Sequence, residues 1–517
     1  MVSLLVLAAA TAAPLNSTAP VATTTLAAAP QDELQQVPMA PPPIAVPAKP
    51  PRVPLPVPPT APPDLSKAAV ENPPMGSDVQ LQRTPRAQAL PYDEDYSDFA
   101  DPAKRKGLWA NLKYIPLTDA SYLSVGGELR WRFELRNEER FGGGKQDDNG
   151  NYEQRIRLWA DLHLGDHLRV FGELKSGLQA GYSGQQLVSD KKTIDLAQAF
   201  VEVHAPAGDG TLSFRVGRQE IGIGGFRLFD MRDGPNVRRS FDAARIRFTQ
   251  GPWDAEVLGG FTITETTTAF DNSTNYEAPF WGARVARDLG SIVPGGRLEG
   301  LWVHTRRPVA KYDAGSAAEA RDTYSLRFSG KQKKLEWDVE AIGQTGHWGD
   351  QSVRAGFLTA YASYGLALPA APRLGLRFEI GSGDKDKSDN RMNTYYQLFA
   401  RPLTINGELG RANLITFGPT ATITPMKKLT VDATVMGLWR TSLQDGLYGA
   451  PGQLIIKADE GTARQVGVRG TLGARYAISP FWVVGTYFNH VQKGRFIKQV
   501  PDGHNLDYFN LFTTVRF

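Results

Sequence analysis

Arginine and glutamate alternate with large apolar residues in the stretch ELRWRFELR, residues 128–136. Every charged side chain has an even number, and Leu129, Trp131, Phe133 and Leu135 stand between them. A guanidinium group stays ionised and binds a carboxylate through two parallel hydrogen bonds. The spacing therefore predicts carboxylate recognition, either of acidic side chains on neighbouring strands or of an anionic solute.

A period of two residues indicates a β-strand, because successive side chains of a strand point to opposite faces. One face of this strand is ionic and the other is apolar. Similar alternation recurs up to residue 517, for example in 152–177, 335–341, 373–380 and 466–476. Such strands suit a barrel with lipid outside and a water-filled lumen inside.

The predicted fold class is all-β, an antiparallel transmembrane β-barrel of about 18 strands, preceded by a disordered Pro-rich segment. The strands are expected to begin near residues 121, 152, 167, 194, 211, 238, 253, 279, 296, 322, 335, 353, 372, 411, 428, 464, 481 and 507. Residues 394–405 are assigned to a loop, because one more strand would make the number odd. A soluble two-sheet sandwich is disfavoured, since a single core rarely reaches about 400 residues.

The predicted connections alternate between long and short, as in bacterial outer-membrane barrels with tight periplasmic turns. The long loops are expected at 137–151, 177–192, 220–237, 264–278, 306–320, 342–352, 382–410, 441–462 and 493–506. The tight turns include 165–166, 206–210, 250–252, 330–334, 369–372, 424–428 and 479–480. This pattern places the tight turns in the periplasm and the long loops outside the cell.

Composition excludes several classes of function. The chain has 58 Lys and Arg against 54 Asp and Glu, a formal charge of +4, and no basic cluster that would indicate nucleic-acid binding. It has no cysteine, which excludes disulfides, thiol catalysis and thiolate metal sites. The seven histidines are scattered without metal-ligand spacing.

The N-terminal part is predicted to lie outside the barrel. Residues 1–13 resemble a secretory signal peptide, although its usual basic start is missing. Residues 14–105 are rich in Ala, Pro and Thr, which favours an extended, disordered segment, either a periplasmic spacer or contact arm or a linker without a partner. The barrel is assigned to residues 106–517, in the Gram-negative outer membrane, with the N-terminal segment in the periplasm.

The chain ends DYFNLFTTVRF, with Phe509, Leu511, Val515 and Phe517 on one face of a strand. A C-terminal strand ending in an aromatic residue resembles the signal by which barrel-assembly machinery recognises its substrates. We therefore expect Phe517 to contact that machinery.

Residues 214–248, FRVGRQEIGIGGFRLFDMRDGPNVRRSFDAARIRF, resemble the alginate-export family of outer-membrane proteins. The similarity continues through 413–440, 466–488 and 490–497. It implies a monomeric barrel of about 18 strands, possible periplasmic export partners, and passage of an anionic uronate polymer through an Arg-lined constriction. In the alginate exporter a long periplasmic turn plugs the pore, whereas the turn here is only AISP, residues 477–480, so the resemblance does not supply that plug.

Assigning the strand faces by their apolar partners predicts which arginines line the pore. The proposed substrate-binding residues are Arg130, Arg132, Arg155, Arg157, Arg215, Arg218, Arg245, Arg247, Arg327, Arg377 and Arg469. Acids are predicted on the same inner face, with concentrations near 254 and 336–340. Two interpretations remain open: the set makes the pore anion-selective, or each Arg pairs with an acid and braces the wall.

Other chemistry is weakly supported. Residues 381–390, GSGDKDKSDN, contain three aspartates but lack the mid-loop Gly and terminal Glu of a calcium loop, which favours a solvated surface loop. A barrel-wall hydrolase would need a Ser paired with His490, and none is identifiable. We therefore predict no catalytic residue, no metal and no cofactor.

The resulting hypothesis is a non-enzymatic outer-membrane channel for anionic saccharides, exporting an acidic, alginate-like exopolysaccharide. The alternative is a passive porin for uptake of small anionic or sugar solutes. The expected partners are the saccharide and the surrounding lipid.

Overall fold

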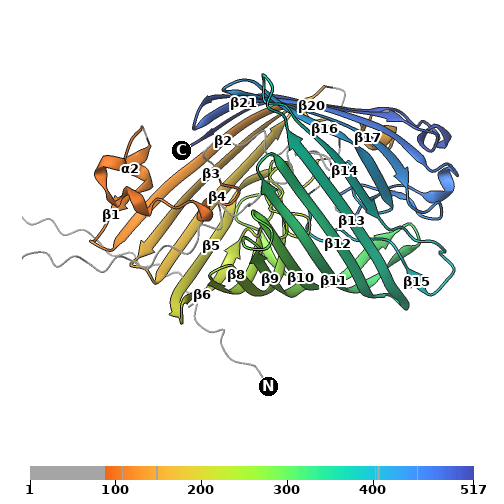
Figure 1. The fold of residues 1–517 in the computed structure, drawn as a ribbon. Coiled ribbons are helices and arrows are strands. Elements are labelled where there is room, and N and C mark those ends of the chain that lie inside the picture. Colours follow the sequence, from red (N-terminus) through yellow and green to blue (C-terminus); the bar gives the residue numbers. More distant parts are fainter. Residues whose placement is uncertain are drawn as a thin grey trace, which may run out of the picture. The chain divides into compact units, whose positions relative to one another are not determined.

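The computed structural model describes residues 88–517 except 108, 147–148, 185, 402, 404–407 and 451, so the predicted signal peptide lies outside the described residues. The described chain forms a closed, antiparallel barrel of eighteen strands (Figure 1). Among the described residues, no helix is long and apolar enough to cross a membrane.

The barrel strands follow each other in chain order. The first nine are β2 (Ser121–Asn137), β3 (Asn151–Leu164), β4 (Leu168–Ala180), β5 (Lys192–Ala207), β6 (Gly210–Gln219), β7 (Phe241–Gln250), β8 (Trp253–Thr264), β9 (Ser273–Asp288) and β10 (Gly296–Tyr312). The others are β11 (Gly315–Gln332), β12 (Leu335–Trp348), β13 (Gln351–Gly365), β14 (Arg373–Gly381), β16 (Leu414–Met426), β17 (Leu429–Arg440), β20 (Gln465–Ser479), β21 (Trp482–Lys493) and β22 (Leu506–Arg516).

Short elements precede the barrel or lie in its loops. Before β2 come η1 (Pro91–Asp93), η2 (Ser97–Ala100), η3 (Pro102–Lys104), α2 (Ala110–Lys113) and β1 (Ile115–Pro116). The loops contain η4 (Glu139–Gly142), β15 (Arg391–Met392), β18 (Leu447–Tyr448), β19 (Leu454–Ile456), η5 (Ala458–Glu460) and η6 (Ile497–Gln499).

The first and last strands of the barrel pair with each other and close it. β2 and β22 are antiparallel, with Glu128 opposite Arg516 and Asn137 opposite Asp507. This pairing satisfies the backbone hydrogen bonds of the two edge strands, which would otherwise present unpaired N–H and C=O groups to lipid.

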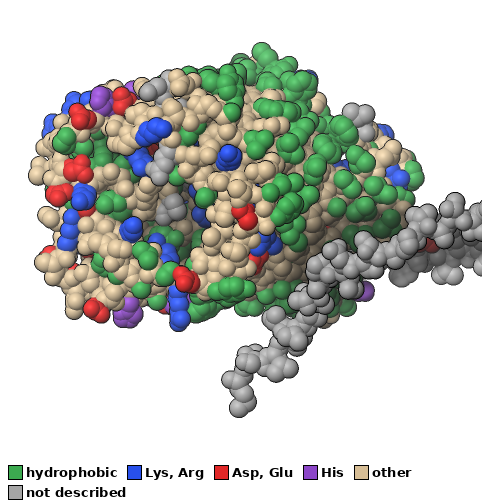
Figure 2. All heavy atoms as spheres, turned by 180° about the vertical axis from the view of Figure 1, so that it is seen from behind, with side chains coloured by type: hydrophobic (Ala, Val, Ile, Leu, Met, Phe, Trp, Pro, Cys, Tyr) green, Lys and Arg blue, Asp and Glu red, His purple; other side chains and the backbone are tan. Residues whose placement is uncertain are grey.

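The two faces of the strands differ as the alternation predicts. In β2, Arg130 and Arg132 are 1% and 3% exposed, whereas Trp131 between them is 43% exposed. Large apolar side chains cover the outer wall, among them Leu135, Leu158, Leu174, Val201, Phe214, Ile246 and Val257. Figure 2 shows this apolar surface on one side of the barrel. An apolar exterior around a polar interior is the arrangement that a membrane barrel requires.

The two ends of the barrel carry different connections. At one end, here called the turn edge, β2 begins, β22 ends, and most connections are short, such as residues 165–167 between β3 and β4. At the other end, the loop edge, long connections include 220–240, 382–413 and 441–464. The predicted alternation of long and short connections is therefore largely confirmed.

Two predicted long loops are wrong. β10 and β11 continue to a two-residue turn at residues 313–314, and β12 and β13 meet in another at Gly349 and Asp350. Pro308 lies within the predicted loop 306–320, but the ladder accommodates it with an irregularity between Arg307 and Ala310. Beyond it, Tyr312 packs edge-on against Trp348, 5.8 Å between ring centroids, which stabilises both extensions.

The predicted end of the disordered segment at residue 105 is also too late. Residues 88–104 contain η1, η2 and η3, and Leu90 and Tyr92 are each 4% exposed. Proline content alone predicted an unpacked chain, whereas apolar residues at the end of the segment find partners on the inner wall. The rest of the segment lies outside the described residues.

The lipid-facing assignment can be tested at Trp131. Trp131→Arg places a cation in the hydrocarbon region and should lower the free energy of unfolding by roughly 2–4 kcal/mol near the midplane. Urea unfolding of the protein in lipid vesicles measures this change. Trp131→Phe is the control and should retain most of the stability; equal, small effects of both variants would contradict the assignment.

Candidate functional site: the lumen and its arginines

Ten of the eleven proposed arginines lie on the inner face of the barrel, and contacts divide the full set into three groups. The pore-lining prediction for Arg218 is wrong, because residue 218 shares the outer face of β6 with the exposed Phe214 and Val216. Arg130, Arg132 and Arg155 contact a loop inside the lumen. Six others form ion pairs with acids: Arg157, Arg215, Arg218, Arg245, Arg247 and Arg327. Arg377 lies over the ring of Tyr361, and Arg469 donates to Asn489.

The first group holds residues 233–235 through their backbone carbonyls. Arg130 donates to the carbonyl oxygens of Asp233 and Pro235, each at 3.0 Å, and Arg132 donates to that of Gly234 at 2.7 Å. Arg155 donates to the Asp233 carbonyl at 3.0 Å and forms an ion pair of 2.9 Å with its carboxylate. Three guanidinium groups from β2 and β3 thus fasten one turn of the chain inside the barrel.

The fastened turn belongs to the connection between β6 and β7, loop 220–240. Both strands are only ten residues long, whereas the preceding strand β5 has sixteen. Loop 220–240 therefore leaves the wall part-way along the barrel and folds into the lumen.

Loop 220–240 meets the connection between β14 and β16, loop 382–413, inside the barrel. Phe229 packs against Phe399, with ring centroids 5.1 Å apart, and Asp230 forms an ion pair of 3.1 Å with Arg401. Apolar wall residues join these rings in one buried cluster. The sequence predicted a water-filled lumen; much of the described lumen is instead filled by loops.

The second group supports the bracing interpretation for single residues. Arg157 pairs with Glu173 at 2.6 Å, and Arg215 pairs with Glu202 at 2.9 Å. In both pairs the partner lies on the adjacent strand, so each ion pair links two neighbouring strands of the wall. A guanidinium already bound to a carboxylate attracts a passing anion less strongly.

A cavity of about 320 Å³ remains between the two loops and the loop-edge ends of β8, β9 and β10. Its lining includes Arg232, Arg239, Arg307, Tyr396 and Phe399. The Arg307 guanidinium lies 3.6 Å from the ring centroid of Tyr396, and that of Arg239 lies 5.6 Å from the ring centroid of Phe399. The cavity thus combines cations with aromatic faces.

Arg232 and Arg239 differ from the arginines that the strand pattern predicted. Within the described part of the chain, neither guanidinium group has a carboxylate within ion-pair distance, and Nη1 of Arg239 is buried without a hydrogen-bond partner. Nearby Glu265 pairs with Lys175, and Asp230 pairs with Arg401. The two loop arginines therefore present positive charge to the cavity without a direct ion pair, and Glu265 lines the same cavity.

The charge of these two arginines is retained despite burial. Burial lowers the pKa of Arg232, and burial together with the neighbouring charge of Arg232 lowers the pKa of Arg239 to about 9. The ordinary pKa of an arginine side chain is the highest among the ionisable side chains, so both guanidinium groups remain mostly protonated at neutral pH.

Sequence reasoning missed Arg232 and Arg239, although both lie in the stretch that resembles the alginate-export family. Their loop has no period of two, so no face could be assigned to them. The available signal was the pair Arg238-Arg239 between two strands. Adjacent side chains of a strand point to opposite faces, so two neighbouring cations do not fit the one-sided charge pattern of the strands.

The residues proposed for other chemistry have structural contacts instead. In the 381–390 loop, Asp386 accepts hydrogen bonds from the backbone and hydroxyl of Ser388, and Asp384 accepts one from the backbone of Asn393. Among the described residues, no group of His, Asp and Glu side chains could hold a metal ion. His490 lies 2.7 Å from Asp507.

Comparison with known proteins now places the chain. The sequence profile for alginate export matches residues 121–510. The chain belongs to the alginate export family. No curated protein sequence matches it significantly.

Solved structures of similar fold come from Pseudomonas aeruginosa. OccD3 (OpdP) has a TM-score of 0.54 at 9% identity, over 85% of this chain and 97% of that chain. OccK9 (OpdG) has a TM-score of 0.54 at 11% identity, over 76% and 98%. OpdK with vanillate has a TM-score of 0.52 at 10% identity, over 77% and 98%. At these identities the likeness concerns the fold.

Removing one fastening arginine should loosen loop 220–240. Arg155→Gln loses charge-assisted hydrogen bonds worth about 1.5–3 kcal/mol, so the population with the loop displaced should rise roughly tenfold or more. Single-channel recording in planar bilayers should show more frequent openings to a larger conductance.

Arg247→Gln is the matched control, because Arg247 pairs with Asp254 on the wall and, among the described residues, forms no hydrogen bond or ion pair with loop 220–240. The same increase in both variants would show that general loss of wall pairing, rather than release of the loop, changes the conductance.

Proposed function

We propose that the protein is an outer-membrane channel for anionic saccharides whose main role is export of an acidic, alginate-like exopolysaccharide. The observation that carries the proposal is the pair Arg232 and Arg239, which line a lumen cavity with no carboxylate within ion-pair distance among the described residues. Family membership supports the same substrate class.

The cavity suits a sugar ring that bears a carboxylate. A guanidinium binds a carboxylate with good geometry, and the faces of Tyr396 and Phe399 offer apolar surfaces on which a ring can pack. The volume of about 320 Å³ is at the lower end of ligand pockets, enough for a single ring with its substituents. A polymer would pass one residue at a time through such a space.

The apolar outer wall supports a location in the outer membrane. Short turns at one end support a periplasmic position of that end and of the N-terminal segment. We further infer that the barrel is a monomer, that its assembly depends on Phe517, and that it catalyses no reaction.

The second candidate is a passive porin for small anionic or sugar solutes. The small cavity favours it, as does the solved structure of OpdK with vanillate, a small carboxylate. Lower extracellular uronic acid in a strain that lacks the protein would favour export. Lost growth on a small anionic sugar would favour uptake.

Anion preference should depend on the unpaired arginines. In a partly hydrated cavity each guanidinium should contribute on the order of 1 kcal/mol to a nearby anion, so Arg232→Gln/Arg239→Gln should lower the chloride-to-potassium permeability ratio roughly tenfold or more. Reversal potentials under a KCl gradient in planar bilayers measure this ratio.

Arg391→Gln/Arg495→Gln removes the same charge from exposed positions of the loop edge and should retain most of the preference. Potassium preference in the wild type, or equal losses in the two double variants, would refute the role of the cavity arginines.

A further inference from the structure

Residues 88–94, here called the plug segment, lie inside the barrel near the turn edge. Ala89, Leu90 and Tyr92 are at most 5% exposed, and they form one apolar cluster with wall residues and with Phe226 and Met231 of loop 220–240. The plug segment therefore fills the lumen from the side opposite to the long loops.

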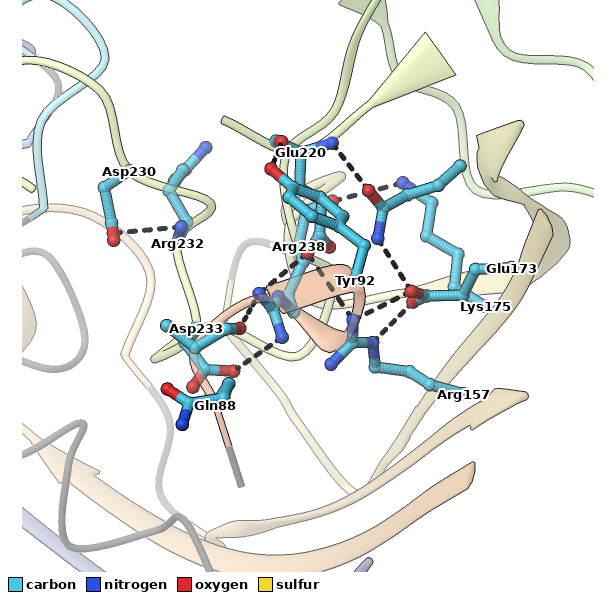
Figure 3. A network of polar contacts seen from close by, with 12 residues as sticks. Gln88, Tyr92, Arg157, Glu173, Lys175, Glu220, Asp230, Arg232, Asp233 and Arg238 are labelled. Carbon is cyan, nitrogen blue, oxygen red and sulfur yellow. Dashed lines mark hydrogen bonds and ion pairs between the residues drawn. The ribbon is translucent and has the colours of Figure 1, made fainter. Parts of the chain in front are cut away.

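Tyr92 is the main contact of the plug segment. Its ring packs edge-on against Phe171 and Phe200, at 6.0 and 5.4 Å between centroids, and the Arg215 guanidinium lies 4.2 Å from its centroid. Its hydroxyl donates to the backbone carbonyl of Glu220 at 2.7 Å (Figure 3). Tyr92 thus joins the wall to the first residue of loop 220–240.

Arginines hold the backbone of the plug segment. Arg169 donates to the carbonyl oxygen of Tyr92 at 2.6 Å, and Arg238 donates to that of Ala89 at 2.8 Å. Arg516 donates to the Gln88 carbonyl at 3.0 Å and pairs with the Glu94 carboxylate at 2.6 Å. The plug segment belongs to no strand of the sheet, so it can leave without breaking a ladder.

The chain that follows is attached to the barrel rim. The indole ring of Trp109 lies 4.8 Å from the ring of Phe517, and Lys113 Nζ donates to the Phe517 carbonyl at 2.9 Å. A segment that leaves the lumen would therefore remain tethered at the turn edge, close to its binding position.

The plug of the alginate exporter, a long turn near the C-terminal end, has no counterpart here, because β20 and β21 are joined by only residues 480–481. We propose that the plug segment closes the turn-edge half of the lumen and that an anionic saccharide displaces it. Arg169 and Arg238 keep their ion pairs with Asp161 and Glu220, and each would exchange only the neutral carbonyl oxygen of the plug segment for a saccharide carboxylate, which binds a guanidinium more strongly. The displacement part rests on the proposed function; the closure part does not.

Closure is tested by single-channel conductance of the full-length protein in planar bilayers. Tyr92→Ala should raise the mean conductance roughly threefold or more, because a vacated binding position shifts the population to the open state. Tyr92→Phe keeps the ring and should show a smaller increase. Tyr364→Ala, which removes an equal ring from the exposed face of β13, should behave as the wild type.

Electrophoresis of unheated samples identifies any variant that fails to fold, because the folded barrel resists unfolding on such gels. Wild-type conductance in a folded Tyr92→Ala variant overturns closure, whatever the ion preference of the channel. An anion preference without this increase would leave the proposed function intact and refute the plug.

Displacement is tested by labelling a cysteine at Leu90 in the otherwise cysteine-free chain. A membrane-impermeant maleimide should label Leu90→Cys slowly, and oligogalacturonate should accelerate labelling roughly threefold or more, whereas neutral maltohexaose should not. Equal rates with both saccharides overturn displacement by anions. Fast labelling without any saccharide overturns closure.

Discussion

Every guanidinium group on the inner wall of this barrel needs an acceptor, because an unpaired charge at low polarity costs several kcal/mol. The strands supply acids for eight of the predicted arginines, such as Glu173 for Arg157 and Glu128 for Arg155. Carbonyl oxygens of other segments add further acceptors to several wall arginines. This requirement explains why loop 220–240 and residues 88–94 lie inside the barrel: each brings backbone acceptors to arginines of the wall.

The same requirement decides where selectivity can arise. Paired arginines stabilise the wall, and the field that a solute experiences comes from the cations left without carboxylates. Arg232 and Arg239 are such cations among the described residues, and both lie on loop 220–240. Under the proposed function such a channel would differ from a fixed ring of charges, because movement of the loop would change both the width and the charge of the passage.

The sequence was informative where side chains alternate. The faces of β2, with Arg130 inside and Trp131 outside, and the predicted eighteen strands follow from the period of two. The contents of the lumen do not follow from it, because loop residues such as Arg239 have no regular spacing. Nor does alternation reveal partners: it places Arg155 inside but cannot say that Asp233, far away in the chain, binds it. The proline-rich start misled for a related reason, since proline predicts local conformation but not tertiary packing.

The central claim is that wall arginines hold loop 220–240 inside the lumen. Val237 is a buried loop residue next to the fastened turn, and the chain has no native cysteine, so Val237→Cys can be labelled selectively with a membrane-impermeant maleimide. The account predicts slow labelling of Val237→Cys in lipid vesicles, fast labelling of exposed Asn390→Cys, and fast labelling at both positions once Arg130→Gln/Arg155→Gln is added. Labelling of Val237→Cys that is as fast as that of Asn390→Cys with all arginines intact, or that stays slow when the two are replaced, would contradict it.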